Sequence, residues 1–145
     1  MEFWALVIGT ALIAVLVPEI KALTDRPRPP DPLISVGGSA FPSGHATQAT
    51  LYAWIGVTLA LRVVPGLTRR SLVIALGILI TVMIGLTRVY LRVHWLSDVS
   101  SGWALGVSCY TLAAAVVLVV AYIRDNPRRA NAPELDPGAG AGSRD

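Results

Sequence analysis

The sequence has little charge. Only 14% of its 145 residues are Asp, Glu, Lys or Arg, whereas 54% are hydrophobic, and the mean hydropathy is +0.62. A soluble domain carries about 25% charged residues, so this chain lacks the polar surface that a water-soluble protein needs. We therefore interpret it as an integral membrane protein.

Other scarcities exclude further classes. The single cysteine, Cys109, lies within an apolar run, has no internal disulfide partner and is interpreted as a buried thiol. The net charge of +3 is small and dispersed, and aromatic residues do not alternate with basic ones as in a single-strand binder, so we expect no nucleic-acid partner. The chain has two histidines, His45 and His94, each at the head of an apolar run.

Four apolar segments are candidates for crossing a bilayer, which takes about 20 residues. They cover residues 3–17, 46–64, 71–86 and 99–123. Because lipid cannot satisfy open sheet edges, the predicted fold is all-α, a polytopic bundle of about four transmembrane helices. The first segment is short and is closed by Pro18 and Glu19. Its acidic start argues against a signal peptide, so we interpret it as a spanning helix that lacks some of its start or uses "PEIKAL" to finish.

We expect one membrane-embedded domain over residues 1–125, with the chemical motifs within 21–98, and a polar, disordered cytoplasmic tail over 126–145. Gly102 and Gly106 form a small-xxx-small pair, and Gly77 and Gly85 are further small positions. All four suit close helix packing.

Four crossings place the Pro- and Gly-rich stretch before residue 46 and the joint "TRVYLRVHWLSD" on one membrane face. The loop "RVVPGLTRR" and the tail share the other face. The positive-inside rule favours the cytoplasm for this second face. The first face is then extracytoplasmic, provided that its own cations bind an anion.

The first face gathers cations, both histidines and a carboxylate. Ser43 can cap the helix that follows it, and the free N–H groups of that first turn attract phosphate, which Gly44 allows to approach closely. His94 and Asp98 are four residues apart, so they share a helix face and the carboxylate can orient the ring. Each feature alone is often a cap, a surface pair or a snorkelling arginine. The combination favours chemistry on an oxyanion. The full set on this face is Lys21, Arg26, Arg28, Ser43, Gly44, His45, Arg88, Arg92, His94 and Asp98.

These residues resemble the three-part signature of the type 2 phosphatidic acid phosphatase family of membrane lipid phosphatases, which shares its site with the vanadium haloperoxidases. The stretch "KALTDRPRP" carries the first part, with Lys21 and Arg28, and "PSGH" is the second part. The third part is "TRVYLRVHWLSD", with Arg88, His94 and Asp98 at the family's spacing. Thr87 stands where the family usually has Ser.

The resemblance implies a role for each residue. His94 is the nucleophile that forms a phosphohistidine, Asp98 orients it, and His45 is the general acid. The phosphoryl oxygens are held by Lys21, Arg28, Ser43, Gly44 and Arg88. The resemblance also implies that no metal or other cofactor is needed. Family members commonly have six spans, so we expect this chain to lack N-terminal helices of that core.

The predicted function is a metal-independent phosphatase in a bacterial inner membrane. Its substrate comes from the bilayer and is a lipid phosphate or diphosphate, either a polyprenyl diphosphate such as undecaprenyl diphosphate or a phosphatidate-type lipid. The alternative is a truncated, weak or inactive family member that binds lipid phosphates or partners. A transporter is disfavoured because the span interiors are almost bare of charge. A homo-oligomer that supplies helix contacts is a further expectation.

Overall fold

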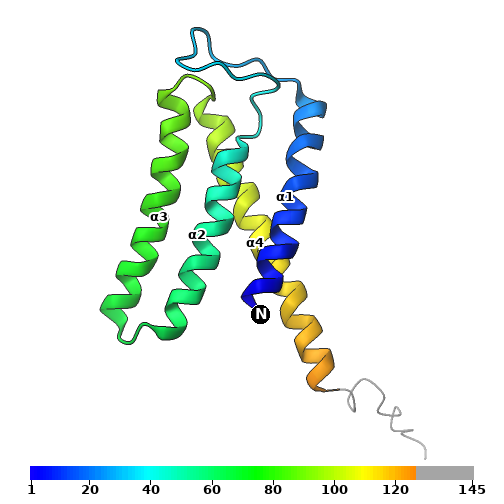
Figure 1. Ribbon diagram of the computed structural model, residues 1–145, viewed down its shortest axis with the longest axis vertical. Coiled ribbons are helices and arrows are strands. Elements are labelled where there is room, and N and C mark those ends of the chain that lie inside the picture. Colours follow the sequence, from blue (N-terminus) through cyan, green and yellow to red (C-terminus); the bar gives the residue numbers. More distant parts are fainter. Residues whose placement is uncertain (127–145) are drawn as a thin grey trace, which may run out of the picture.

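The computed structural model describes residues 1–126, which form four α-helices. They are α1 (Glu2–Thr24), α2 (Gly44–Val63), α3 (Leu67–Tyr90) and α4 (Leu96–Asp125). The helices run up and down, so that the 25–43 loop and the 91–95 turn lie at one end and the 64–66 turn lies at the other (Figure 1). The predicted all-α bundle is confirmed. Of the predicted tail, residues 127–145 lie outside the described residues.

Helix α1 continues through Pro18, so the expectation that Pro18 and Glu19 close the first segment was wrong. A proline inside a helix removes one N–H donor, and here the side chain is exposed and turned away from the bundle. The buried face of α1 repeats every four residues, at Ala5, Gly9, Ile13 and Val17. "PEIKAL" therefore belongs to the helix and carries Lys21 to the loop end of the bundle.

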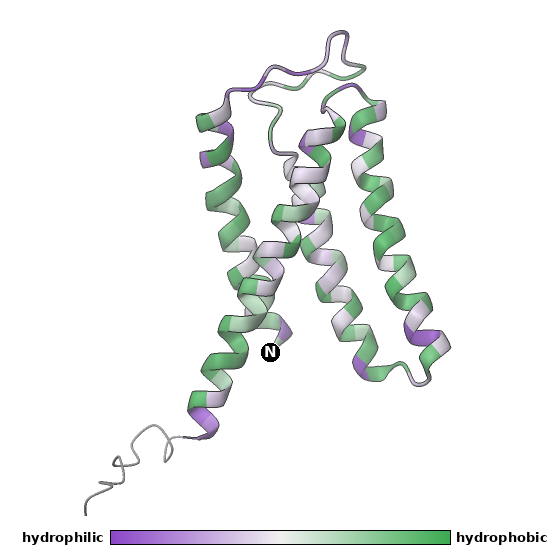
Figure 2. Cartoon of the chain, turned by 180° about the vertical axis from the view of Figure 1, so that it is seen from behind, coloured by the Kyte–Doolittle hydropathy of each residue, from purple (hydrophilic) through white to green (hydrophobic). Residues whose placement is uncertain are grey.

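Three helices, α1, α3 and α4, are long and apolar enough to cross a membrane, but α2 does not reach that hydropathy. Segment 46–64, one of the four candidates from the sequence, is therefore the least apolar of them. Helix α2 packs against all three other helices and buries Thr47 and Thr50, whose hydroxyls donate to the carbonyls of Ser43 and Ala46. A helix that its neighbours shield from lipid can carry such polar groups. Figure 2 shows apolar residues along most of α1, α3 and α4.

Glycines set how closely the helices approach, as the sequence predicted. A Cβ atom on Gly102 would lie 2.7 Å from the carbonyl oxygen of Ser43, and one on Gly106 would lie 2.6 Å from that of Thr47. Gly77 and Gly85 of α3 face Val57 and Trp103 equally closely. The contact of α4 with α2 at Gly102 and Gly106 brings the first turns of these two helices together at the loop end.

The apolar core lies among α1, α2 and α4. Its buried side chains are Ile13, Val17, Leu51, Ile55 and Cys109. The buried position predicted for Cys109 is confirmed. Because this core lies below the loop end, it holds the three helices that carry Lys21, Ser43 and Asp98 in fixed relative positions.

Candidate active site

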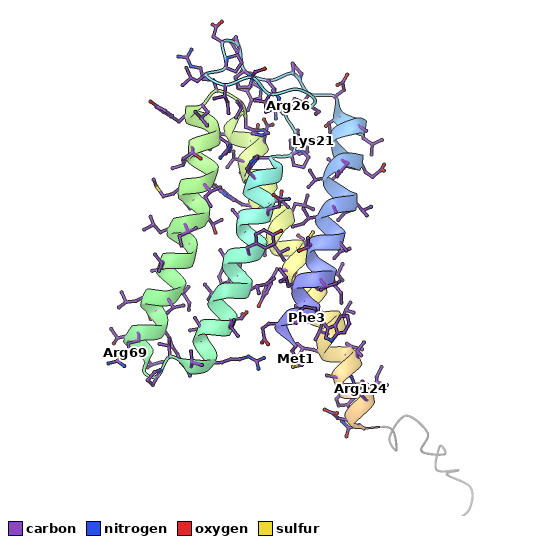
Figure 3. The ribbon with its side chains drawn as sticks, viewed as in Figure 1. Met1, Phe3, Lys21, Arg26, Arg69 and Arg124 are labelled. Atoms are coloured by element: carbon purple, nitrogen blue, oxygen red, sulfur yellow. The ribbon has the colours of Figure 1, made fainter. Side chains whose placement is uncertain are left out.

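The predicted site residues lie at the loop end of the bundle, each at an end of a helix or in a loop. Lys21 lies in the last turn of α1, Ser43 is the N-cap of α2, Arg88 lies in the last turn of α3 and Asp98 lies in the first turn of α4. Figure 3 shows Lys21 and Arg26 at this end, with Arg69 and Arg124 at the opposite one. The shared membrane face inferred from the sequence is therefore present in the fold.

Backbone hydrogen bonds join the second motif to the third and fix the shape of the third. The N–H of Ser43 donates to the carbonyl oxygen of Asp98 at 2.9 Å, which joins the start of α2 to the start of α4. The N–H groups of Val93 and His94 donate to the carbonyl oxygen of Arg88 at 3.2 and 3.3 Å. These bonds fix the end of α3 against the turn that carries His94.

The imidazole of His94 is buried, and its Nδ1 atom lies 2.7 Å from the carbonyl oxygen of Ala40. A carbonyl only accepts, so Nδ1 carries the proton and Nε2 is the unprotonated nitrogen. The nearest oxygen of Asp98, Oδ2, is 3.6 Å from Nδ1. The sequence predicted that Asp98 accepts this hydrogen bond, whereas in the structure the Ala40 carbonyl does.

Asp98 is fully buried and both of its carboxylate oxygens have closer partners. Oδ1 accepts from the Arg26 guanidinium at 2.7 Å, and Oδ2 accepts from the N–H of Trp95 at 2.8 Å. A carboxylate at a helix N-terminus takes such donors because they satisfy both the charge and the first N–H groups. Asp98 is therefore next to His94 but hydrogen-bonded elsewhere.

The surroundings keep His94 neutral at pH 7. Burial lowers the pKa of its imidazole below the ordinary value near 6.5. The hydrogen bond to Ala40 raises this pKa, the charges of Arg28 and Lys21 lower it, and the charge of Asp98 raises it. The net direction is downward, so the ring presents an unprotonated Nε2, the form that a nucleophile requires.

Arg28 and Lys21 are held beside His94 by backbone carbonyl groups of the 25–43 loop and of the 91–95 turn. Arg28 donates to Val93 at 2.6 Å, to Gly37 at 2.9 Å and to Gly38 at 3.0 Å. A longer contact of 3.4 Å joins it to the Ser39 carbonyl, which also accepts from the ammonium of Lys21. Lys21 has three donors and Arg28 has five. Both therefore keep donors that these bonds do not use.

Ser43 and Arg88 contain buried polar atoms without partners among residues 1–126, namely Ser43 Oγ and Arg88 Nε. Ser43 stands at the predicted N-cap, but its hydroxyl makes no cap hydrogen bond, so the predicted capping role was wrong. Leaving a buried polar atom unpaired costs about 1–3 kcal/mol. The two atoms therefore indicate a place where a ligand supplies the missing partner.

Gly44 and His45 begin α2 directly after Ser43. A Cβ atom on Gly44 would meet only a methyl group of Val17, at 3.6 Å, so the backbone there stays open to a ligand. The His45 side chain is exposed, and Arg88 and Lys21 lie close enough for their charges to act on it. Exposure lets His45 exchange protons with water, which a general acid must do in each cycle.

A cavity of about 420 Å³ adjoins His94 on the side of the loop. Its walls are mostly apolar, with one cation at the rim. The lining residues are Pro29, Pro30, Val89, Arg92, His94, Trp95 and Leu96. Among residues 1–126, no three His, Cys, Asp or Glu side chains stand close enough together to hold a metal ion.

Sequence reasoning placed Arg26 on this face but gave it no role, although it is the closest cation to Asp98. The signal is the repeat Arg-Pro-Arg-Pro from residue 26 to residue 29. Each proline disfavours helix in the residue before it, and in an extended segment side chains two apart point to the same side. Arg26 therefore reaches the cluster together with Arg28.

The helical bundle holds a neutral histidine among cations at one end, an arrangement whose charge suits an anionic group. The sequence model of the PAP2 superfamily matches residues 2–126, and the chain belongs to this superfamily. The resemblance seen in the motifs is thereby confirmed.

Two relatives are similar over most of the matched region. Over 95 residues the chain is 32% identical to phosphatidylglycerophosphatase B of Bacillus subtilis (strain 168). This alignment covers 64% of this chain and 47% of the relative. The crystal structure of a transmembrane PAP2 type phosphatidylglycerolphosphate phosphatase from Bacillus subtilis superposes with a TM-score of 0.69 at 28% identity. That alignment covers 80% of this chain and 58% of the other. The chain thus spans about half the length of the curated relative.

Proposed function

We propose that the protein is a metal-independent phosphatase that hydrolyses a lipid phosphate through a phosphohistidine formed on His94. The observation that carries this proposal is the state of His94, buried and neutral with Nδ1 bonded to the Ala40 carbonyl. Nε2 is then available to attack a phosphorus atom. The unpaired Ser43 Oγ and Arg88 Nε, at the same end of the bundle, are donors that suit phosphoryl oxygens.

The reaction takes two steps. Nε2 of His94 forms a bond to phosphorus while the bond from phosphorus to the lipid oxygen breaks, and His45 gives its proton to that oxygen. Water then attacks the phosphohistidine, His45 accepts a proton from the water, and the nitrogen–phosphorus bond breaks to release phosphate. Lys21, Arg28 and Arg88 offset the charge on the phosphoryl oxygens, which is the main requirement of phosphoryl transfer.

The substrate class follows from where the site lies. His94 opens into an apolar cavity at the end of three helices that can span a membrane, so the lipid portion can approach from the bilayer while its phosphate enters the cation cluster. The names of the two relatives support phosphatidylglycerol phosphate as a substrate. Phosphatidate and polyprenyl diphosphates present the same terminal phosphate.

The face proposed for the site is extracytoplasmic. Arg62, Arg69, Arg70 and Arg124 all lie at the opposite end of the bundle, near helix ends, and the positive-inside rule favours the cytoplasm for them. Most cations of the site end contact protein carbonyls or a carboxylate. They are therefore part of a binding site and are discounted in the topology rule.

The test is phosphate release by the purified chain in detergent with EDTA present, across phosphatidylglycerol phosphate, phosphatidate and a prenyl diphosphate. We expect turnover that vanadate inhibits and that His94→Ala lowers by at least about 1,000-fold. Arg69→Ala, at the opposite end of the bundle, is the matched control and should leave the rate unchanged. Rapid quenching with ³²P-labelled substrate should trap an acid-labile phosphoprotein that His94→Ala lacks.

Two results would contradict the mechanism, namely full activity in His94→Ala or loss of activity in EDTA that added metal restores. A chain that binds the lipid phosphates but releases no phosphate would instead support the binding function considered as the alternative.

A further inference from the structure

We propose that Arg26 is a positioning residue that holds in place both acceptors facing Nδ1 of His94, the Ala40 carbonyl and the Asp98 carboxylate. This inference rests on the proposed function, because it concerns how the nucleophile is oriented. Arg26 lies in the 25–43 loop. Its side chain bonds the Asp98 carboxylate, and its backbone carbonyl accepts from the N–H of Ala40, the residue whose carbonyl faces His94.

The side chain joins the loop to the start of α4. One terminal nitrogen of the guanidinium, Nη1, donates to Asp98 Oδ1 at 2.7 Å and to Ser97 Oγ at 2.8 Å. The Asp98 side chain is 0% exposed, whereas that of Arg26 is 36% exposed. Arg26 therefore supplies the counter-charge of a buried carboxylate, and the second oxygen of that carboxylate is the one 3.6 Å from His94.

The backbone of Arg26 fixes the other acceptor. The N–H of Ala40 donates to the Arg26 carbonyl at 2.9 Å, and the N–H of Arg26 donates to Ser39 Oγ at 3.0 Å. These bonds hold the segment of Ser39 and Ala40 against Arg26. The Ala40 carbonyl is consequently directed at Nδ1 of His94. Arg26 is thus hydrogen-bonded to both residues, Ala40 and Asp98, whose oxygens lie near Nδ1 of His94.

The charge of Arg26 should have a measurable effect on the pKa of His94. The charged groups that act on the imidazole are Lys21 from α1, Arg28 from the loop and Asp98 from α4. Arg88 of α3 and Lys21 act in turn on His45 of α2. Of the groups that act on His94, Asp98 favours a protonated imidazole. Because Arg26 offsets the charge of Asp98, its removal should let Asp98 act unopposed and raise the pKa of His94.

The first experiment is Arg26→Gln, with Arg69→Gln as the matched control. We expect kcat to fall about 100-fold, because a misplacement of about 1 Å has an effect of that size. KM should stay within about twofold, because the guanidinium bonds protein groups and not the substrate. The acidic limb of kcat/KM, which reports the free enzyme, should move upward by about one pH unit.

A second variant separates orientation from charge. Arg26→Lys keeps the positive charge near Asp98, so its acidic limb should match the wild-type limb. A single ammonium lacks the planar fork of guanidinium, so kcat should stay reduced, although less than in Arg26→Gln. This variant also decides the question if Arg26→Gln does not give folded protein in detergent.

An assay without turnover keeps this inference separate from the proposed function. The ¹⁵N chemical shifts of His94 report which ring nitrogen carries the proton and at which pH the ring titrates. Arg26→Gln should raise that midpoint, whether or not the chain hydrolyses a lipid. Inactivity of the wild type would overturn the phosphatase and leave this readout intact. An unchanged titration in Arg26→Gln, or a loss confined to KM, would overturn the role given to Arg26.

Discussion

The carbonyl oxygen of Ala40 lies 2.7 Å from Nδ1 of His94, whereas the nearest oxygen of Asp98 lies 3.6 Å away. A backbone carbonyl cannot take up a proton at ordinary pH, so it holds the imidazole in one tautomer over the working range. Asp98 then contributes its negative charge and its ion pair with Arg26. The orienting role and the electrostatic role, which often fall to one carboxylate, are divided here between two groups.

This division predicts the effect of Asp98→Asn on the pH profile. Asp98 raises the pKa of His94, so removing the charge lowers that pKa. Activity needs the neutral imidazole and increases as the pH rises through the pKa, so the acidic limb of kcat/KM should move to lower pH. This direction is opposite to that expected for Arg26→Gln.

The same variant should retain measurable turnover, because the Ala40 carbonyl still fixes the tautomer. We expect kcat to fall about 100-fold, the effect of a modest loss of orientation. Rates measured from pH 4.5 to 8 with one lipid substrate give both quantities. An acidic limb that stays in place or moves upward would show that Asp98 does not act on the His94 titration.

His45→Gln tests the general acid. His45 is exposed at the start of α2, near the charges of Arg88 and Lys21. Losing a general acid lowers the rate by about 100- to 10,000-fold when the leaving group is a poor one such as a lipid alkoxide. A nitrophenolate leaves without a proton, so hydrolysis of p-nitrophenyl phosphate should fall far less. Equal losses on both substrates would point to a binding role for His45.

Ser43→Ala should separate ligand binding from stability. The Ser43 hydroxyl is buried and unpaired among the described residues. Its removal should therefore leave the free energy of unfolding unchanged or raise it by about 1 kcal/mol. Inhibition by vanadate should weaken about tenfold, the loss of one hydrogen bond to a charged group. A clear drop in stability with unchanged vanadate inhibition would contradict the ligand-binding role given to this hydroxyl.

The sequence predicts most of this architecture because lipid limits the choice of structure. Long apolar runs must be helices, and the spacing of the motifs placed Lys21, Ser43 and His94 at one end. The sequence left open whether α1 ends at Pro18 or continues through "PEIKAL", since the effect of Pro18 depends on which side of the helix faces the bundle. The polar α2 is explained only by its three helical neighbours.

The finer geometry of the site depends on contacts between distant segments. His94 and Asp98 are four residues apart in the sequence, and their proximity in space could be predicted from that spacing. The acceptor that His94 uses, the Ala40 carbonyl, lies 54 residues away in the chain, and the cation that Asp98 uses lies 72 residues away. No local pattern specifies such pairs, so the partners that His94 and Asp98 use could be recognised only once the loop was folded over the helix ends.

Gly106→Ala tests whether the close contact of α2 and α4 supports the site. The added Cβ would lie 2.6 Å from both the Thr47 carbonyl oxygen and Thr50 Cβ, so the helices must separate. Overpacking of this kind destabilises by about 1–3 kcal/mol. Gly56→Ala is the matched control, because nothing lies within 4 Å of its added Cβ. That change should be neutral or stabilising by up to about 1 kcal/mol, since Ala favours helix. Thermal unfolding in detergent measures both. Equal stabilities for the two variants would show that the α2–α4 contact yields without cost.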